Sequence, residues 1–202
     1  MNYSELVGYL GIEKGDSIWL SSEIIRLALK VKNTGEKFDP NLFIDEIQKA
    51  LGESGTLLIP TFSFEFCNKG HYDMVKSKGT TGALGNIALQ RADFKRTRHP
   101  MHSFAVWGRD KEMLVGMNNL HSFGVDSPFA YCMRNNVKQI ILGTDYVHAM
   151  TFVHYAEVVC GVPYRFSKSF EGIYVDEKGF AEKRKYDYSA RILEICPEEK
   201  FN

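Results

Sequence analysis

Short apolar segments alternate with stretches that have helical spacing, and this alternation constrains the fold more than any other feature. The apolar segments are residues 17–20, 55–60, 103–108 and 139–143. Segments of this kind indicate buried strands, and the amphipathic stretches between them indicate helices. The alternation predicts an α/β fold: a three-layer α/β/α sandwich around a mixed sheet.

Turn and capping residues indicate where several elements begin and end. Asp39-Pro40 combines a helix cap with a proline at the first helical position. Gly52 follows the last apolar residue of the same stretch, so we predict a helix between them. Ser21 and Ser22 follow the first strand, and a serine is a suitable N-cap for a helix over residues 23–30.

Three segments outside this alternation carry other signals. In residues 61–66 the phenylalanines recur with a period of two, so we expect them on one side of an extended chain. Residues 67–81 are polar without periodicity and predict a long loop, which in compact domains is often functional. Residues 171–176 and 180–186 flank a polar turn and predict a C-terminal antiparallel hairpin.

Composition restricts the class of protein. The 202 residues suit a single domain, residues 1–202, with 44% hydrophobic and 25% charged residues. No apolar run approaches the ~20 residues of a membrane span, and the first residues lack the regions of a signal peptide. We therefore expect a cytoplasmic protein. The formal net charge of +0 gives no electrostatic reason to expect nucleic acid or an anionic membrane as a partner.

The cysteines are scattered and form no C-x-x-C pair: Cys67, Cys132, Cys160 and Cys196. This pattern favours reduced thiols over a disulfide framework or a zinc site, so we expect no bound metal. An alternative is a metal-dependent hydrolase. Its ligands would be His99, His102, His154 and Glu157, but Pro100 argues against a helical pair of histidine ligands.

The segment 151–157 carries the residues best suited to catalysis. On a helix, Thr151, His154 and Glu157 share one face because they lie three residues apart. A carboxylate one turn from an imidazole orients it and raises its basicity, which suits a general base. The alternative is a helix with an apolar stripe, Phe152 and Tyr155 included, in which the histidine is only a partly buried residue.

A second group of residues suits the binding of an anion. Ser21 and Ser22 stand between a strand and a helix start, where free backbone N–H groups and the helix dipole favour negative charge. An ordinary helix cap is the competing interpretation. The basic run 95–98 is likewise interpreted either as solvated surface or as part of the same site.

Several blocks in this order resemble the aminoglycoside 3-N-acetyltransferase family, over roughly residues 5–165. Each block alone is a weak signal, whereas their order along the chain is specific. The blocks are Ser21-Ser22, residues 55–62, His99-Pro100, Ser103-Phe104-Ala105, Phe123-Gly124, Ser127-Pro128, Leu142-Gly143 and residues 151–157.

The resemblance implies transfer of an acetyl group from acetyl-CoA to an amine of an aminoglycoside or a related amino sugar. It assigns His154 as the base, Glu157 as its orienting carboxylate and Thr151 as a donor to the thioester oxygen or to pantetheine. Donors around Ser103 and Phe104 are candidates for the oxyanion. The residues expected to line the coenzyme are Ser21, Ser22, Thr80, Thr81, Arg98, Ser103 and Phe104.

The implied partners are CoA and a small amine-bearing sugar, with the chain a monomer or a homodimer. The chain departs from the family pattern at Leu20, where a histidine is common, and in the looser block 78–85, and it is shorter than typical members. Arg165 and Lys168 suggest a second acceptor class, a nucleotide-linked amino sugar of surface-polysaccharide synthesis. A third interpretation is a CoA-binding member without activity.

Overall fold

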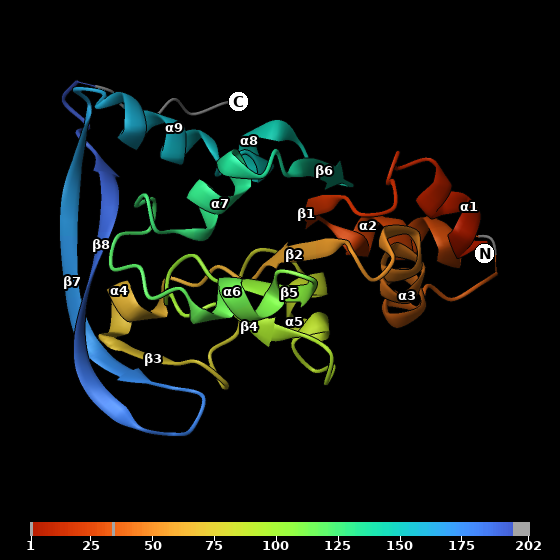
Figure 1. The fold of residues 1–202 in the computed structure, drawn as a ribbon, viewed down its shortest axis with the longest axis horizontal. Coiled ribbons are helices and arrows are strands. Elements are labelled where there is room, and N and C mark those ends of the chain that lie inside the picture. Colours follow the sequence, from red (N-terminus) through yellow and green to blue (C-terminus); the bar gives the residue numbers. More distant parts are fainter. Residues whose placement is uncertain (1, 34, 196–202) are drawn as a thin grey trace.

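A computed structural model describes residues 2–33 and 35–195 of the chain. Its larger sheet has the order β4-β5-β2-β1-β6 (Figure 1). Strand β1 pairs in parallel with β2 and β6, whereas β5 runs antiparallel to β2 and β4, so the sheet is mixed as predicted. The bounds are β1 Ser17–Ser22, β2 Thr56–Pro60, β4 Lys95–Arg96, β5 Phe104–Gly108 and β6 Lys138–Leu142.

Helices cover both faces of this sheet, which confirms the three-layer arrangement. Side chains alternate along each strand, so Ile18 and Leu20 pack in one apolar cluster while Trp19 packs in the other. The first cluster includes α1 Tyr3–Gly8, α2 Ile24–Lys32, α3 Pro40–Leu51 and α5 Ala83–Ala88. The second includes α6 Lys111–Gly116, α7 Pro128–Arg134 and α9 Val153–Cys160.

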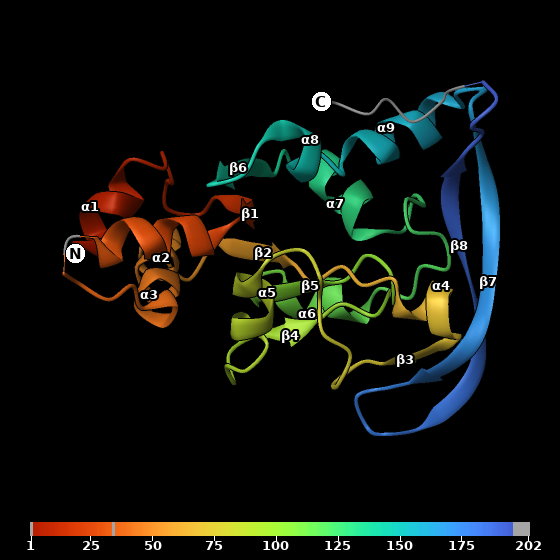
Figure 2. The ribbon, with the colours of Figure 1, turned by 180° about the vertical axis from the view of Figure 1, so that it is seen from behind.

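The predicted hairpin is part of a second sheet with the order β3-β7-β8. Strands β7 Arg165–Val175 and β8 Ala181–Arg191 form a long curved ribbon at the end of the molecule opposite α1 (Figures 1 and 2). Strand β3 His71–Asp73 pairs in parallel with β7. A third apolar cluster, which includes Tyr72, Met101 and Tyr174, fixes the ribbon to the body of the protein.

Two local predictions are wrong. Ser21 and Ser22 are the last residues of β1, paired with β6, so neither caps α2; the N-cap is Glu23, whose carboxylate accepts from the N–H of Ile25. The phenylalanines of residues 61–66 do not share one side, because α4 Glu65–Lys69 begins within that segment. Part of the predicted loop 67–81 is likewise ordered, as the end of α4 and as β3.

The remaining predicted boundaries agree closely with the structure. Helix α3 begins at Pro40, with the carboxylate of Asp39 accepting from two backbone N–H groups, and ends before Gly52. Cys67, Cys132 and Cys160 are free thiols, and Cys196 lies outside the described residues. No helix in the described part of the chain is long and apolar enough to cross a membrane.

Candidate active site

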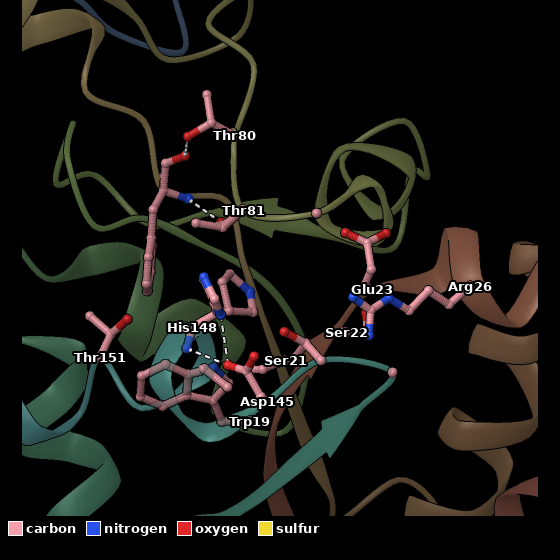
Figure 3. A pocket seen from close by; sticks show the side chains of 16 residues that line it. Trp19, Ser21, Ser22, Glu23, Arg26, Thr80, Thr81, Asp145, His148 and Thr151 are labelled. Atoms are coloured by element: carbon pink, nitrogen blue, oxygen red, sulfur yellow. Dashed lines mark hydrogen bonds and ion pairs between the residues drawn. The ribbon is translucent and has the colours of Figure 1, made fainter. Parts of the chain in front are cut away.

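A cavity of about 390 Å³ opens where β1 ends, between β6, the segment 80–82 and the short helix α8 Tyr146–Ala149. Figure 3 shows the side chains around it, with Thr151 on one side and Arg26 on the other. The cavity lies at the carboxyl ends of the parallel strands β1 and β6, where α/β sheets commonly bind ligands. The predicted site residues that line it are Ser21, Ser22, Thr80, Thr81 and Thr151.

The end of β1 supplies two hydroxyl groups. Ser21 is 7% exposed, and its Oγ lies 3.4 Å from Nε2 of Gln139, which donates to the carbonyl of Ala149 at 2.8 Å. Gln139 thereby connects β6 to α8 beside the cavity. The hydroxyl of Ser22 makes no hydrogen bond to a described residue, so it is available to a ligand.

The segment 80–82 is hydrogen-bonded to Phe62, which follows β2, and it approaches the end of β1 at Gly82. The hydroxyl of Thr80 donates to the carbonyl of Phe62 at 3.2 Å. The hydroxyl of Thr81 accepts from the backbone N–H of Phe62 at 3.1 Å. Gly82 has φ +88°, and a Cβ there would lie 2.6 Å from the carbonyl oxygen of Ser22. A glycine at this position therefore lets the two segments approach closely enough to share one cavity.

Charged side chains surround the polar part of the cavity. The carboxylate of Glu23 already caps α2, so the N-terminus of that helix is not an open anion site. Arg26, one turn into α2, supplies a positive charge to the cavity wall. Nδ1 of His148 lies 2.7 Å from Oδ1 of Asp145, and this hydrogen bond holds the pKa of Asp145 below its usual value.

His154 and Glu157 lie on the first turns of α9 and form the pair expected from their spacing. Nδ1 of His154 is 2.7 Å from Oε2 of Glu157. The side chains are 25% and 14% exposed, respectively. The ring of His154 also meets the edge of Phe123, with 5.6 Å between ring centres. Nε2 makes no hydrogen bond to a described residue, so it is the nitrogen free to act on a substrate.

Arg165, the first residue of β7, completes this group. Its Nε lies 2.6 Å from Oε2 of Glu157, at an angle that makes the contact an ion pair rather than a hydrogen bond. Nη2 lies 2.8 Å from Nδ1 of His154. When Nδ1 donates its hydrogen to Glu157, this contact is electrostatic only, because the nitrogen cannot then accept from Arg165. Nη1 donates to the carbonyl of Ser189 at 3.0 Å. With its side chain only 6% exposed, Arg165 is a buried cation with an anionic partner.

Burial and charge act on both titratable groups of this site. Burial lowers the pKa of His154, and the positive charge of Arg165 lowers it further, against the opposing effect of Glu157. Burial alone would raise the pKa of Glu157, but His154 and Arg165 together hold it below its usual value. These directions favour a neutral imidazole beside an ionised carboxylate.

The position of His154 relative to the cavity follows from the helix. Its backbone N–H donates to the carbonyl of Thr151 at 3.1 Å, and Thr151 lines the cavity wall. His154 itself does not line the cavity; it lies one turn further along the chain. The imidazole is thus neither sealed in the interior nor placed among the residues that line the cavity.

Comparison with known proteins places the chain in a family. The sequence profile of aminoglycoside 3-N-acetyltransferase matches residues 31–199. The chain belongs to the aminoglycoside 3-N-acetyltransferase family. Members of this family are acyltransferases that use acetyl-CoA as co-substrate, and the enzyme class predicted from the sequence is confirmed.

Solved structures of this family share the fold. Aminoglycoside acetyltransferase AAC(3)-Xa matches with a TM-score of 0.78 and 19% identity, over 99% of this chain and 76% of that one. AAC-IIIb in a binary complex with CoASH matches with a TM-score of 0.75 and 20% identity, over 93% and 74%. AAC-VIa with bound sisomicin matches with a TM-score of 0.77 and 20% identity, over 94% and 76%.

The structure places three of the predicted coenzyme residues away from the cavity of this acetyltransferase family member. Arg98 lies beside Glu177, 3.4 Å away, and borders a separate hollow. Ser103 and Phe104 are fully buried. Ser103 is hydrogen-bonded to Thr61 and Arg96, and Phe104 packs in the second apolar cluster, so neither reaches a ligand in this conformation.

Arg26 was not predicted as a site residue, although it is a cation one turn after Ser22. Arg165 was expected to meet the phosphates of an acceptor, whereas it is buried against Glu157, because the contact between β7 and α9 is tertiary. His99 and His102 are buried, and each is hydrogen-bonded to the hydroxyl of Ser122 rather than to His154. Among the described residues, no group of three or more His, Cys, Asp or Glu could hold a metal ion.

Proposed function

We propose that this protein transfers an acetyl group from acetyl-CoA to an amine of an aminoglycoside or a related amino sugar, with His154 as general base. One observation carries the proposal. The imidazole of His154 is fixed at Nδ1, 2.7 Å from Glu157, while Nε2 stays free one turn from a wall of the cavity. Membership of the acetyltransferase family supports the reaction class.

The residues around the cavity suit the coenzyme. The ring of Trp19 lines the cavity and offers an apolar wall against which the arm of pantetheine would pack. The free hydroxyl of Ser22 offers a further contact, and Arg26 would bind a phosphate.

The chemistry assigned to His154 follows from the state of the acceptor. An aliphatic amine is largely protonated near neutral pH and is then not nucleophilic. Nε2 of neutral His154 would take one proton from the amine, and Glu157 would stabilise the resulting imidazolium through Nδ1. The free amine then attacks the thioester carbon of acetyl-CoA, the C–S bond breaks, and CoA leaves as the thiol with the second proton of the amine. Thr151, on the cavity wall one turn from His154, is placed to donate to an oxygen of the bound coenzyme.

Two classes of acceptor are chemically possible, an aminoglycoside-type amine and a nucleotide-linked amino sugar. A nucleotide-linked amino sugar would need cations for its phosphates. Arg165 is 6% exposed and already contacts Glu157, His154 and Ser189, so it is not free for this purpose. This leaves exposed Lys168 on the same strand. We therefore favour an aminoglycoside-type acceptor, with a nucleotide-linked amino sugar and a CoA binder without activity as the alternatives.

The test is acetyl-CoA consumption, measured as released thiol, with deoxystreptamine antibiotics and nucleotide-linked amino sugars as separate acceptor sets. We expect turnover with the first set and at least a ~100-fold loss of kcat in His154→Ala. The affinity for CoA, measured by calorimetry, should change little in that variant. Turnover with the second set alone would favour the nucleotide-linked acceptor, and CoA binding without turnover would indicate an inactive member.

His148→Ala is the matched control. This histidine also pairs with a carboxylate, Asp145, and it lines the cavity directly. If His154 is the base, His148→Ala should lower kcat by less than about threefold, with its main effect on the KM for acetyl-CoA. A collapse of kcat in His148→Ala together with normal turnover in His154→Ala would reject the assignment.

A further inference from the structure

Arg165 holds together three elements that meet behind His154. Each nitrogen of its guanidinium has a separate neighbour: Glu157 on α9, the imidazole of His154 on the same helix, and the carbonyl of Ser189 on β8. Because the side chain is 6% exposed, water screens these contacts poorly. The guanidinium therefore acts on the charge of the histidine pair as well as on its position.

Oε2 of Glu157 contacts both the imidazole of His154 and the guanidinium of Arg165, and its negative charge stabilises the charged form of each. It lies 2.7 Å from the imidazole and 2.6 Å from the guanidinium. Only one of these two groups can give up its proton near neutral pH, because a guanidinium in a protein is effectively always charged. With Arg165 charged and Glu157 ionised, the pair is neutral, and a protonated His154 would add an uncompensated positive charge.

The other charged and titratable groups near the imidazole do not supply that compensation. Arg191, on β8 opposite Arg165, adds positive charge that further disfavours the imidazolium. His102, in the segment before β5, has its own pKa lowered by burial and by neighbouring histidines that include His154, so it is neutral and adds no negative charge. Tyr188 on β8 is partly buried, and this burial raises its pKa, so it remains neutral.

We propose that Arg165 is a positioning residue that neutralises Glu157 and thereby keeps His154 in its neutral form, so that Nε2 is available to take a proton from the acceptor amine. This inference rests on the proposed function for its consequence in catalysis. Without Arg165, the lone carboxylate of Glu157 would draw a proton onto the imidazole. The resulting imidazolium could not act as a base.

The test is a histidine titration followed by NMR on protein labelled with ¹⁵N at histidine, in wild type, Arg165→Gln and Glu157→Gln. Arg165→Gln keeps a hydrogen-bond donor near Ser189 but removes the charge. We expect its His154 midpoint to rise by about one pH unit. Glu157→Gln should move the midpoint in the opposite direction, because Arg165 then acts on the ring alone. Lys168→Gln removes an exposed cation on the same strand and should leave the midpoint unchanged.

The pH dependence of kcat/KM supplies the second measurement. In Arg165→Gln the acidic limb should shift upward with the NMR midpoint, so that activity is about tenfold lower on the acidic side while the alkaline plateau is retained. Arg165→Lys, which keeps the charge, should restore the wild-type limb. A purely structural role for Arg165 would instead lower activity equally at every pH.

The two proposals fail in different ways. An unchanged His154 midpoint in folded Arg165→Gln would overturn the role of Arg165, whatever the activity. If Arg165→Gln does not fold, the Glu157→Gln variant is the test. A His154 midpoint that rises or stays unchanged in Glu157→Gln would then overturn the role of Arg165. A midpoint that moves as expected in a protein that acetylates no acceptor would retain the role of Arg165 and reject the proposed function.

Discussion

Nη2 of Arg96 donates to the carbonyl oxygen of Thr61 at 2.9 Å, and this bond connects edge strand β4 to the end of β2. The same guanidinium donates to Ser103 Oγ at 2.9 Å and to the carbonyls of Met74 and Ser77. Arg96 is only 5% exposed. It fixes the start of the segment that carries Thr80 and Thr81, so it shapes the cavity without touching it.

Removal of Arg96 should destabilise the protein far more than removal of Arg98. Arg96→Met leaves several buried carbonyl groups without a donor, and we expect a loss on the order of 3 kcal/mol in the free energy of unfolding. Arg98→Met loses one partly exposed contact with Glu177, so its effect should stay within about 0.5 kcal/mol. Urea unfolding of both variants gives the comparison, and equal losses would contradict it.

Gly82→Ala should weaken the binding of the coenzyme. The added Cβ would lie 2.6 Å from the carbonyl oxygen of Ser22, at a positive φ, so the segment 80–82 has to move away from β1. We expect the KM for acetyl-CoA to rise about tenfold or more. Gly179→Ala is the matched control, because φ is +83° there but nothing lies within 4 Å of the added atom. It should cost only the backbone strain of about 1 kcal/mol and leave the KM unchanged.

Elements with local signals were predicted well from the sequence. Helix α3 has a cap, a proline and a terminal glycine within its own residues, and the apolar runs at β1 and β2 are continuous. The pairing of His154 with Glu157 was also predictable, because it depends only on helix geometry. In each case the information lies within one turn or one strand of the residue concerned.

Features that depend on contacts distant in sequence were not predictable. Strand β3 forms because β7 pairs with it across about a hundred residues, and its own three residues carry no strand pattern. Arg96 and Arg98 have the same spacing as two residues on one face of a strand, but β4 ends at Arg96. The chain direction then changes, so one arginine is buried and the other is not.

Acid should destabilise the protein through its buried histidines. Burial lowers the pKa of His99 to about 3, against 6.5 in the unfolded chain. Above pH 6.5 the residue is neutral in both states and has no effect. As the pH falls below 6.5, the unfolded state binds a proton that the folded state does not, so stability decreases down to about pH 3. His99 alone should cost about 3 kcal/mol at pH 4.5.

Urea unfolding of wild type and His99→Asn between pH 4.5 and pH 8 checks this prediction. Asparagine retains an acceptor for the backbone N–H groups of Met101 and His102, which now donate to Nδ1 of His99. The variant should be less stable at pH 8 but lose less stability on acidification. Parallel pH profiles for the two proteins would show that His99 does not contribute.

Trp19→Phe should weaken the binding of CoA without weakening the fold. The Nε1 of Trp19 is buried without a partner, while its ring packs edge-on against Phe104, 5.0 Å between centres. Phenylalanine keeps an aromatic ring in this cluster and removes the unpaired donor, so the loss of packing is offset by the loss of an unsatisfied group. Trp19 also lines the cavity, and phenylalanine is the smaller ring, so we expect an increase of about threefold in the Kd for CoA and little change in stability. Trp107→Phe, at the other tryptophan, lies outside the cavity and should leave the Kd unchanged. A wild-type Kd in Trp19→Phe, measured by calorimetry, would show that no ligand group meets this indole.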